Sequence, residues 1–157
     1  MPWIKTGFII ASECPTRGEN LNIGAYMIDI RTLLVDDNPE FLEAAKRFIT
    51  SEEQLKIIGT ALSGQEAIEK VKELNPDLVL MDLAMPDMNG LEATRHIKRQ
   101  SSSPHVVILT LHDTPEYREA SEAVGADGFV PKSDFGVQLL PLVKALFEGV
   151  ESAVPTS

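Results

Sequence analysis

The chain alternates short, unbroken apolar runs with longer segments in which apolar residues recur at every third or fourth position. An unbroken run is typical of a strand that is buried on both faces, and the wider spacing is typical of a helix that buries one side. The pattern predicts five strands, each followed by a helix, with the strands at 30–35, 55–60, 78–81, 105–110 and 127–131. This alternation predicts a parallel sheet with right-handed crossovers and helices on both faces.

Polar residues mark where several of these helices begin. Asn38 is predicted to cap the first helix, with Pro39 at the first helical position, where its missing N–H costs nothing. Ser63 and Glu66 form a capping box at the start of the second helix, and Thr114 is the expected cap of the fourth. The fifth helix is expected to begin near residue 133 and to bury Val137, Leu140, Leu142 or Val143, and Phe147.

The composition of the strands predicts their order in the sheet. The first, third and fourth strands are the most apolar and belong in the middle, whereas Pro131 lacks a backbone donor and places the fifth strand at an edge. The order 2-1-3-4-5 satisfies these conditions. The predicted class is therefore α/β, a flavodoxin-like doubly wound sheet of five parallel strands with five helices.

The two ends of the chain do not share this pattern. Residues 1–28 lack a sustained period and are assigned to an N-terminal extension, for which disorder and an added or alternative start before Met27 both stay open. Residues 29–149 are predicted to form one domain, and residues 150–157 a C-terminal tail. With 157 residues, of which 43% are apolar, the chain can fill one core of ordinary size.

Charge and cysteine content narrow the classes of function. A formal net charge of −10 argues against direct contact of this chain with nucleic acid, which requires clustered Lys and Arg. The single cysteine cannot form an internal disulfide, no Cys/His cluster has the spacing of metal ligands, and no apolar run is long enough to cross a membrane. These observations predict a cytoplasmic protein without a membrane segment.

Polar side chains stand at the carboxyl ends of four of the five predicted strands. Asp36 and Asp37 follow the first strand, Asp82 follows the third, Thr110 ends the fourth, and Lys132 follows the fifth. The carboxyl ends of parallel strands lie on one side of a sheet, and ligands bind there at the point where the strand order reverses. We therefore expect these five side chains to converge beside the first and third strands.

Three carboxylates in so small a space would repel one another. At about 4 Å and an effective dielectric constant of roughly 20, each pair costs about 4 kcal/mol. Either one acid stays protonated or a divalent cation lies among them, and oxygen ligands without His or Cys favour Mg²⁺. Magnesium shares its shell with phosphate oxygens, and Lys132 and Thr110 suit a phosphoryl group, so Asp82 is the expected nucleophile of an aspartyl phosphate.

Four sequence motifs resemble those of the receiver domain of two-component response regulators, particularly the LuxR-type branch: LLVDD (33–37), DLVLMDLAMPDMNG (77–90), VVILT (106–110) and GADGFVPKSD (125–134). The resemblance covers residues 29 to about 149. It implies that Asp82 accepts phosphate from the phosphohistidine of a sensor kinase. It also implies that Asp37 binds Mg²⁺ directly, that Asp36 binds it at least through water, and that the backbone carbonyl of Ala84 completes the ligands from the protein.

The same resemblance implies a switch. Lys132 would be the lysine of the family that binds the phosphoryl group, Thr110 the switch hydroxyl, and Phe129 the rotating aromatic residue. Phosphate on Asp82 would draw the Thr110 hydroxyl inward and open space for the Phe129 ring, which changes the face made by the fourth helix, the fifth strand and the fifth helix. The implied partners are a sensor histidine kinase or phosphotransfer protein and an output domain or partner protein, and a homodimer stays open.

The leading hypothesis is a signalling switch and not an enzyme that acts on a separate substrate. Its chemistry would be limited to self-phosphorylation from a phosphodonor and autodephosphorylation. One alternative is a receiver-like interaction module that works without phosphorylation, and another is the receiver fragment of a DNA-binding transcription regulator. A phosphohydrolase with an aspartyl nucleophile is a third class, but such enzymes typically carry a second acid two residues after the nucleophile, where this chain has Ala84.

Overall fold

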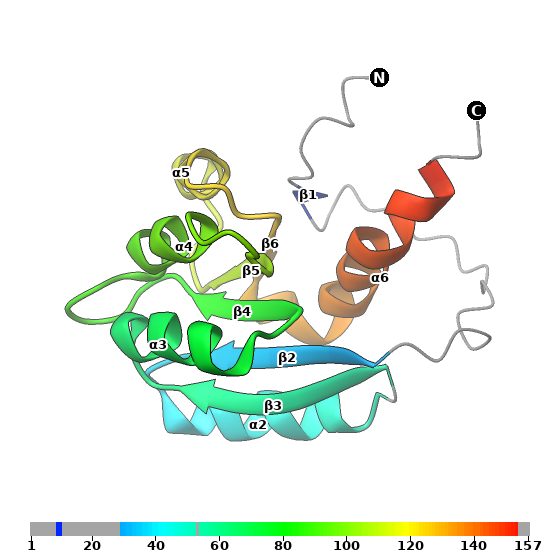
Figure 1. The fold of residues 1–157 in the computed structure, drawn as a ribbon, viewed down its shortest axis with the longest axis horizontal. Helices are drawn as coiled ribbons and strands as arrows, with labels where there is room; N and C mark the ends of the chain where they lie inside the picture. The colour runs from blue at the N-terminus through cyan, green and yellow to red at the C-terminus, as the bar shows by residue number, and fades with distance from the viewer. Residues whose placement is uncertain (1–8, 11–28, 53, 154–157) are drawn as a thin grey trace.

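The computed structural model describes residues 9–10, 29–52 and 54–153, which form a parallel sheet covered by helices on both faces (Figure 1). The strands are β1 (Ile9–Ile10), β2 (Ile30–Val35), β3 (Leu55–Ala61), β4 (Leu78–Asp82), β5 (His105–Thr110) and β6 (Gly128–Pro131). The helices are α2 (Pro39–Thr50), α3 (Gly64–Leu74), α4 (Gly90–Lys98), α5 (Pro115–Ala123) and α6 (Phe135–Ala153). A single 3₁₀ turn, η3 (Lys132–Asp134), joins β6 to α6.

The predicted strand order is confirmed for the five main strands. They lie side by side in the order β3-β2-β4-β5-β6, which is 2-1-3-4-5 in chain order, and every pair is parallel. The observed strands match the predicted segments to within a residue at either end. The α/β class and the doubly wound arrangement therefore follow from the apolar runs alone.

One strand was not predicted. Ile9 and Ile10 pair in parallel with Gly128 and Phe129 on the outer side of β6, so the fifth main strand is not the last one in the sheet. Pro131 was expected at an edge because it lacks a donor, and it lies beyond the two residues that β1 pairs. The rest of the predicted extension, residues 1–8 and 11–28, lies outside the described residues.

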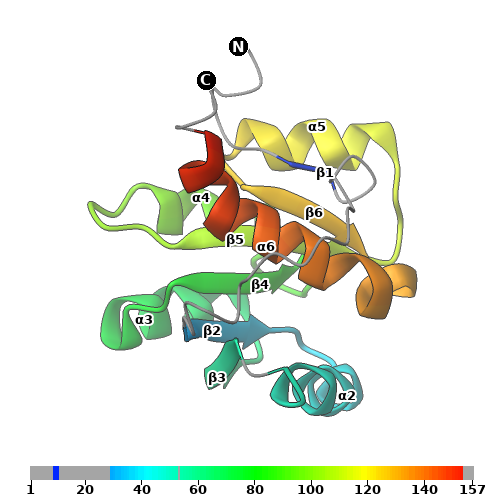
Figure 2. The same ribbon diagram turned by 90° about the vertical axis from the view of Figure 1, so that its right-hand side faces the viewer.

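Helices α2 and α6 cover one face of the sheet, and α3, α4 and α5 cover the other (Figure 2). The central strand β4 shows why its sequence is an unbroken apolar run. Leu78 and Leu80 pack in the core on the α2 and α6 side, whereas Val79 and Met81 pack in the core on the α3 and α4 side. All four are completely buried, because neither face of this strand meets solvent.

The predicted cap residues are in place, but only half of the predicted capping box forms, because the Glu66 carboxylate accepts from the N–H of Leu62 and not from that of Ser63. The side chains of Asn38, Ser63 and Thr114 each accept a hydrogen bond from a backbone N–H in the first turn of their helix. These caps fix the point at which each chain segment leaves the sheet and turns into a helix.

The predicted buried face of α6 is confirmed at Leu142 and Val143, and Leu140 and Phe147 are partly buried against the same core, but the prediction is wrong at one residue. Val137 was expected in the core but is 74% exposed, and the buried stripe consists of Phe135, Leu139, Leu142, Val143 and Leu146. Almost every residue in this part of the helix is apolar, so the spacing alone does not determine which side faces the sheet. The helix also continues to Ala153, past the boundary at residue 149, so the domain limits stay a proposal.

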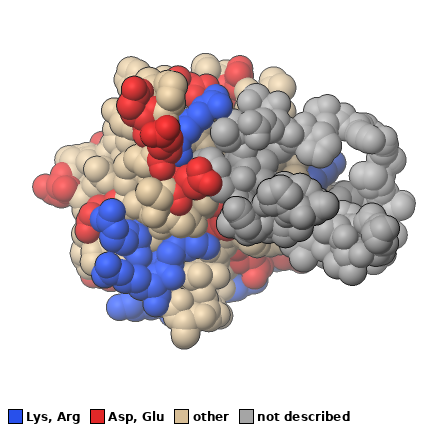
Figure 3. Space-filling model, turned by 90° about the horizontal axis from the view of Figure 1, so that it is seen from above, with Lys and Arg blue, Asp and Glu red and all other residues tan. Residues whose placement is uncertain are grey.

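The exposed charges of α4 and α5 are separated by sign. Arg95 and Arg99 are exposed on and just after α4, whereas Glu116, Glu119 and Glu122 are exposed on α5. Figure 3, which shows the molecule from above, has Lys and Arg gathered in one area of the surface and Asp and Glu in another. Within the described part of the chain, no helix is long and apolar enough to span a bilayer.

Candidate functional site

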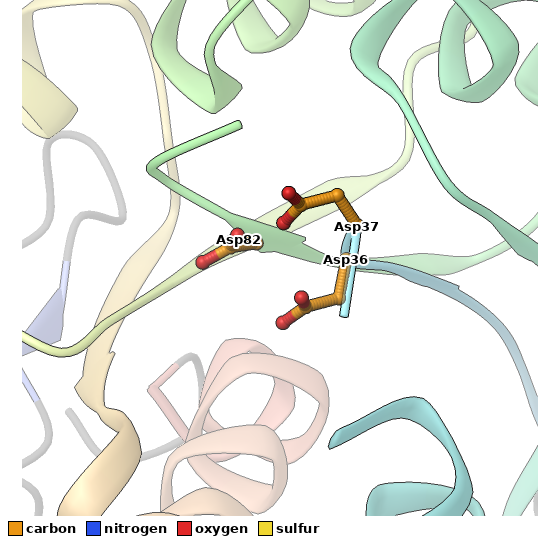
Figure 4. A group of neighbouring side chains, drawn as sticks. All are labelled: Asp36, Asp37 and Asp82. Atoms are coloured by element: carbon orange, nitrogen blue, oxygen red, sulfur yellow. The ribbon is translucent and has the colours of Figure 1, made fainter. Parts of the chain in front are cut away.

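Three aspartates meet at the carboxyl end of the sheet, where the parallel strands finish. Asp36 and Asp37 directly follow β2. Asp82 is the last residue of β4, the strand that pairs with β2 in the sheet. Each carboxylate has an oxygen within 4.8 Å of an oxygen of the others, and Figure 4 shows the three side chains pointing to the same side. Asp36 and Asp82 are buried, and Asp37 is exposed.

Lys132 lies between the two buried acids. Its Nζ atom is 2.6 Å from Oδ2 of Asp36 and 2.9 Å from Oδ1 of Asp82, and its side chain is only 10% exposed. The 3₁₀ turn after β6 brings it to the same end of the sheet as the acids. From the sequence, a protonated acid or a bound metal was expected to relieve the repulsion between the carboxylates. In the structure the positive charge of Lys132 offsets part of that repulsion.

The pKa of Asp82 is raised from its ordinary value of 3.8 to about 6. Burial is the main cause, the hydrogen bond from Lys132 opposes it, and the charges of Asp36 and Asp37 add to it. Burial lowers the pKa of Lys132, but its hydrogen bonds to Asp36 and Asp82 outweigh burial, so the net shift is upward. Asp82 is therefore ionised at neutral pH in surroundings that disfavour its charge.

The cluster has the ligands that a hard divalent cation prefers. Oxygen atoms of three carboxylates lie within 4.8 Å of one another, and one ammonium contacts two of these acids. All ligand atoms of this cluster are carboxylate oxygens, and Ala84, whose carbonyl was the fourth predicted ligand, lies two residues beyond Asp82 in an exposed loop. The acidic cluster can therefore hold a metal ion of the Mg²⁺ type.

Gly90 lets the loop after Asp82 fold back against its own strand. A Cβ atom at Gly90 would collide with the backbone carbonyl oxygen of Asp82. The N–H of Gly90 donates to the carbonyl of Leu83 at 2.8 Å, which closes the loop. The position of the central acid therefore depends on the absence of a side chain here, a dependence that the motif alone does not reveal.

Thr110 and Phe129, the predicted switch residues, lie on the neighbouring strands β5 and β6. The Thr110 hydroxyl donates to the carbonyl of His112 at 3.2 Å and accepts from its N–H at 3.0 Å, so its own loop engages it. Phe129 pairs with Ile108 in the sheet and is completely buried on the side of α3 and α4. In this structure the acids and Lys132 are together, whereas Thr110 ends the strand next to that of Asp82 and Phe129 lies one strand further away.

Arg118 covers the Phe129 ring from α5. Its guanidinium carbon lies 5.6 Å from the ring centroid, and its Nε and Nη2 atoms donate to the two oxygens of Asp113 at 2.7 Å each. Asp113 belongs to the same loop that engages Thr110. The sequence pattern did not indicate a role for Arg118, whose partner Asp113 lies five residues earlier in the chain.

The model of the response regulator receiver domain family matches residues 32–143 of this chain. The response regulator protein VraR of Staphylococcus epidermidis is 35% identical over 122 residues, which is 76% of this chain and 57% of VraR. The chain spans about half the length of the first relatives that it matches, 51% and 57%.

Solved structures have the same fold. A LuxR-family two-component response regulator from Aurantimonas sp. SI85-9A1 superimposes with a TM-score of 0.73 at 32% identity, over 77% of this chain and 86% of that one. A chain of the CheX-CheY-BeF3-Mg+2 complex from Borrelia burgdorferi gives a TM-score of 0.71 at 27% identity, over 79% of this chain and 93% of that one.

Proposed function

Because this chain belongs to the family of response regulator receiver domains of two-component systems, we propose that Asp82 accepts a phosphoryl group from a sensor histidine kinase or phosphotransfer protein in a Mg²⁺-dependent reaction. The observation that carries the proposal is the cluster of Asp36, Asp37 and Asp82 with Lys132 bonded to two of them. A cytoplasmic signalling switch, and not an enzyme with a separate substrate, is the function that this cluster supports best.

The metal ligands in this proposal are Asp37 and Asp82, Asp36 at least through water, and the backbone carbonyl of Ala84. When Mg²⁺ is bound, it supplies positive charge that offsets the acids and the oxygens of the incoming phosphoryl group. The similar chain from Borrelia burgdorferi comes from a complex that contains both BeF3 and Mg²⁺, which supports the assignment.

The transfer itself needs one nucleophile and one fixed cation. A carboxylate oxygen of Asp82 attacks the phosphorus of the phosphohistidine, a new O–P bond forms as the N–P bond breaks, and the imidazole keeps the electron pair and takes up a proton. Lys132 is already 2.9 Å from Asp82 and pairs with the negative charge that develops on a phosphoryl oxygen. Asp36, at 2.6 Å, keeps the ammonium at this position.

The switch begins at Thr110. A phosphoryl oxygen on Asp82 draws the Thr110 hydroxyl away from His112, and the loop that also carries Asp113 moves with it. Phe129, which Arg118 covers, then has a different neighbour, and the face made by α5, β6 and α6 changes. This is a shift between two packings of the same residues, and an output domain or partner protein that contacts the face responds to it.

A second candidate function is the receiver part of a longer transcription regulator. The observation in its favour is that this chain spans 51% of the transcriptional regulatory protein DegU of Brevibacillus brevis, to which it is 32% identical. In that case the output domain lies in the same polypeptide and the chain described here does not itself contact nucleic acid. The phosphorylation chemistry is the same in both cases.

The test is incubation with acetyl phosphate and Mg²⁺, followed by intact mass measurement. The native chain is expected to gain the mass of one phosphoryl group, and the gain should disappear in Asp82→Asn and after chelation of the metal. Asp87→Asn is the matched control, because it removes an exposed acid from the loop that follows Asp82. A native chain that gains no mass, or an Asp82→Asn variant that gains as much as the native chain, would contradict the proposal.

A further inference from the structure

The Lys132 ammonium also contacts an aromatic ring. Its Nζ atom lies over the ring of Phe41, 4.5 Å from the centroid, in addition to its bonds with Asp36 and Asp82. The lysine side chain is 10% exposed, so two carboxylates and one ring replace nearly all of its water. A cation over an aromatic face is attracted to the ring, and more strongly when both are desolvated.

Phe41 is held in register with the acids by a short series of hydrogen bonds. Oδ1 of Asp36 accepts from the N–H of Asn38 at 2.8 Å, and Oδ1 of Asn38 accepts from the N–H of Glu40 at 2.9 Å and of Phe41 at 3.4 Å. The acidic turn and the first turn of α2 therefore form one unit. Because these hydrogen bonds link Asp36 to Phe41 through Asn38, the position of Asp36 at the end of β2 also fixes the position of the Phe41 backbone.

A second contact fixes the Phe41 ring from the lysine side. Phe135 comes three residues after Lys132, and its ring meets the Phe41 ring edge to face, with the centroids 5.5 Å apart. Phe48 lies further along α2, and its ring contacts the same Phe135 ring, with the two centroids 5.6 Å apart. The segment that carries Lys132 thus touches Phe41 twice, once through the ammonium and once through Phe135.

We propose that Phe41 is a positioning residue, which holds the Lys132 ammonium against Asp36 and Asp82 at the place where the phosphoryl group arrives. A lysine side chain has four flexible methylene groups, and a fixed ring at its tip removes most of the alternatives. The consequence for phosphate transfer rests on the proposed function. The placement of the ammonium can be tested without any phosphate.

The first test measures how accessible Lys132 is to reductive methylation, followed peptide by peptide with mass spectrometry. Phe41→Leu should let Lys132 react about three- to tenfold faster than in the native chain, in line with the strength of a largely desolvated cation–ring contact. Phe48→Leu is the matched control, because it removes a ring that contacts Phe135 but does not lie over Lys132. Equal rates in the native chain and Phe41→Leu, or equal acceleration in both variants, would overturn the proposal.

The second test measures phosphate uptake from acetyl phosphate at saturating Mg²⁺, with Mg²⁺ affinity measured by calorimetry. Phe41→Leu should take up phosphate about three- to tenfold more slowly with an unchanged Mg²⁺ affinity, and Phe41→Tyr, which keeps the ring, should restore the rate. An unchanged uptake rate in Phe41→Leu overturns the positioning role. A native chain that takes up no phosphate overturns the proposed function, and the methylation rates alone then decide whether Phe41 holds Lys132.

Discussion

The acids at the two ends of the parallel sheet differ in how many hydrogen-bond donors and positive charges surround them. At the amino end, where the strands begin, Oδ2 of Asp127 accepts from Nζ of Lys98 at 2.9 Å and from the N–H of Val106 at 2.8 Å, and His105 Nδ1 lies 3.5 Å from Oδ1. At the carboxyl end, the ammonium of Lys132 pairs with two of the three clustered acids, Asp36 and Asp82.

The pKa values of Asp82 and Asp127 shift in opposite directions, which reflects this difference. Burial alone would raise the pKa of Asp127, but the nearby His105 ring, the hydrogen bonds from Lys98 and Val106 and the charge of Lys98 together outweigh it, so its pKa lies below the ordinary value. Burial raises the pKa of Asp82 to about 6, and its one donor does not compensate. An acid supplied with donors stabilises the fold, whereas an acid short of them is available to bind a cation or form a covalent bond.

The largest expected effect comes from replacing, one at a time, the lysines that pair with the acids at the two ends of the sheet. Lys132→Met should slow phosphate uptake from acetyl phosphate about 100-fold or more, because it removes a fixed cation from the site where charge develops. Lys98→Met removes the corresponding cation at the amino end and should leave the uptake rate within about twofold of native, since no group at the transfer site is lost. Similar losses of rate in both variants would erase the functional distinction between the ends.

The next effect is on stability at the amino end. Asp127→Asn should lower the free energy of unfolding at pH 7 by about 2–3 kcal/mol, because it removes a carboxylate that accepts charged and backbone donors. The folded-state pKa of Asp127 is lowered, so its contribution is present above the unfolded pKa of about 4 and is lost as pH falls through the folded value. Urea unfolding of both proteins between neutral and acid pH checks this, and a difference that grows on acidification contradicts it.

The equivalent change at the carboxyl end should have the opposite sign. Between pH 3.8 and about 6 the folded state holds more protons on Asp82 than the unfolded state does, so this acid costs the fold stability as pH rises through that window. A rise in the pKa from 3.8 to about 6 corresponds to about 3 kcal/mol, and this figure already includes the opposing bond from Lys132.

Asp82→Asn without metal should therefore be more stable than the native chain at pH 8, by up to about 3 kcal/mol. The advantage should vanish near pH 4 and shrink when Mg²⁺ is added, since the cation offsets the native charge. The measurement is urea unfolding with and without a chelator. A variant that is less stable than the native chain at pH 8 would mean that Asp82 is as well satisfied as Asp127.

The smallest effect concerns two buried threonines. Thr110→Val should slow phosphate uptake about three- to tenfold, because one neutral hydrogen bond to the phosphoryl group is lost. Thr32 in β2 is the control, since its hydroxyl donates to the carbonyl of Ile30 at 3.0 Å, near the amino end of the sheet. Thr32→Val should leave uptake unchanged, and a slower rate in that variant would show that the assay reports general damage to the fold.

The positions of site residues could be predicted from the sequence where the strand topology alone determines them. Asp36, Asp37 and Asp82 were expected together because they end neighbouring parallel strands, and the structure has them within 4.8 Å of one another. Lys132 was expected at the same end of the sheet, but its bond to Asp36 depends on the path of the turn after β6.

Other features depend on packing and left no signal in the pattern. The Phe41 and Arg118 contacts require helix positions relative to the sheet, and a spacing rule does not supply them. Val137 was assigned to the core because α6 is apolar almost all round, so its phase is decided by what it packs against. Strand β1 has only two residues and pairs through its backbone, so an apolar pattern cannot distinguish it from its surroundings.

The close approach of Gly90 to the carbonyl of Asp82 has a consequence for anyone who redesigns this domain. The loop between them presents Ala84, Pro86 and Asp87 to solvent, and these positions are open to variation when a new kinase or phosphodonor is to be recognised. Gly90, the first residue of α4, limits such variation: the exposed positions of the loop can change, provided that residue 90 has no Cβ atom to collide with the backbone of Asp82.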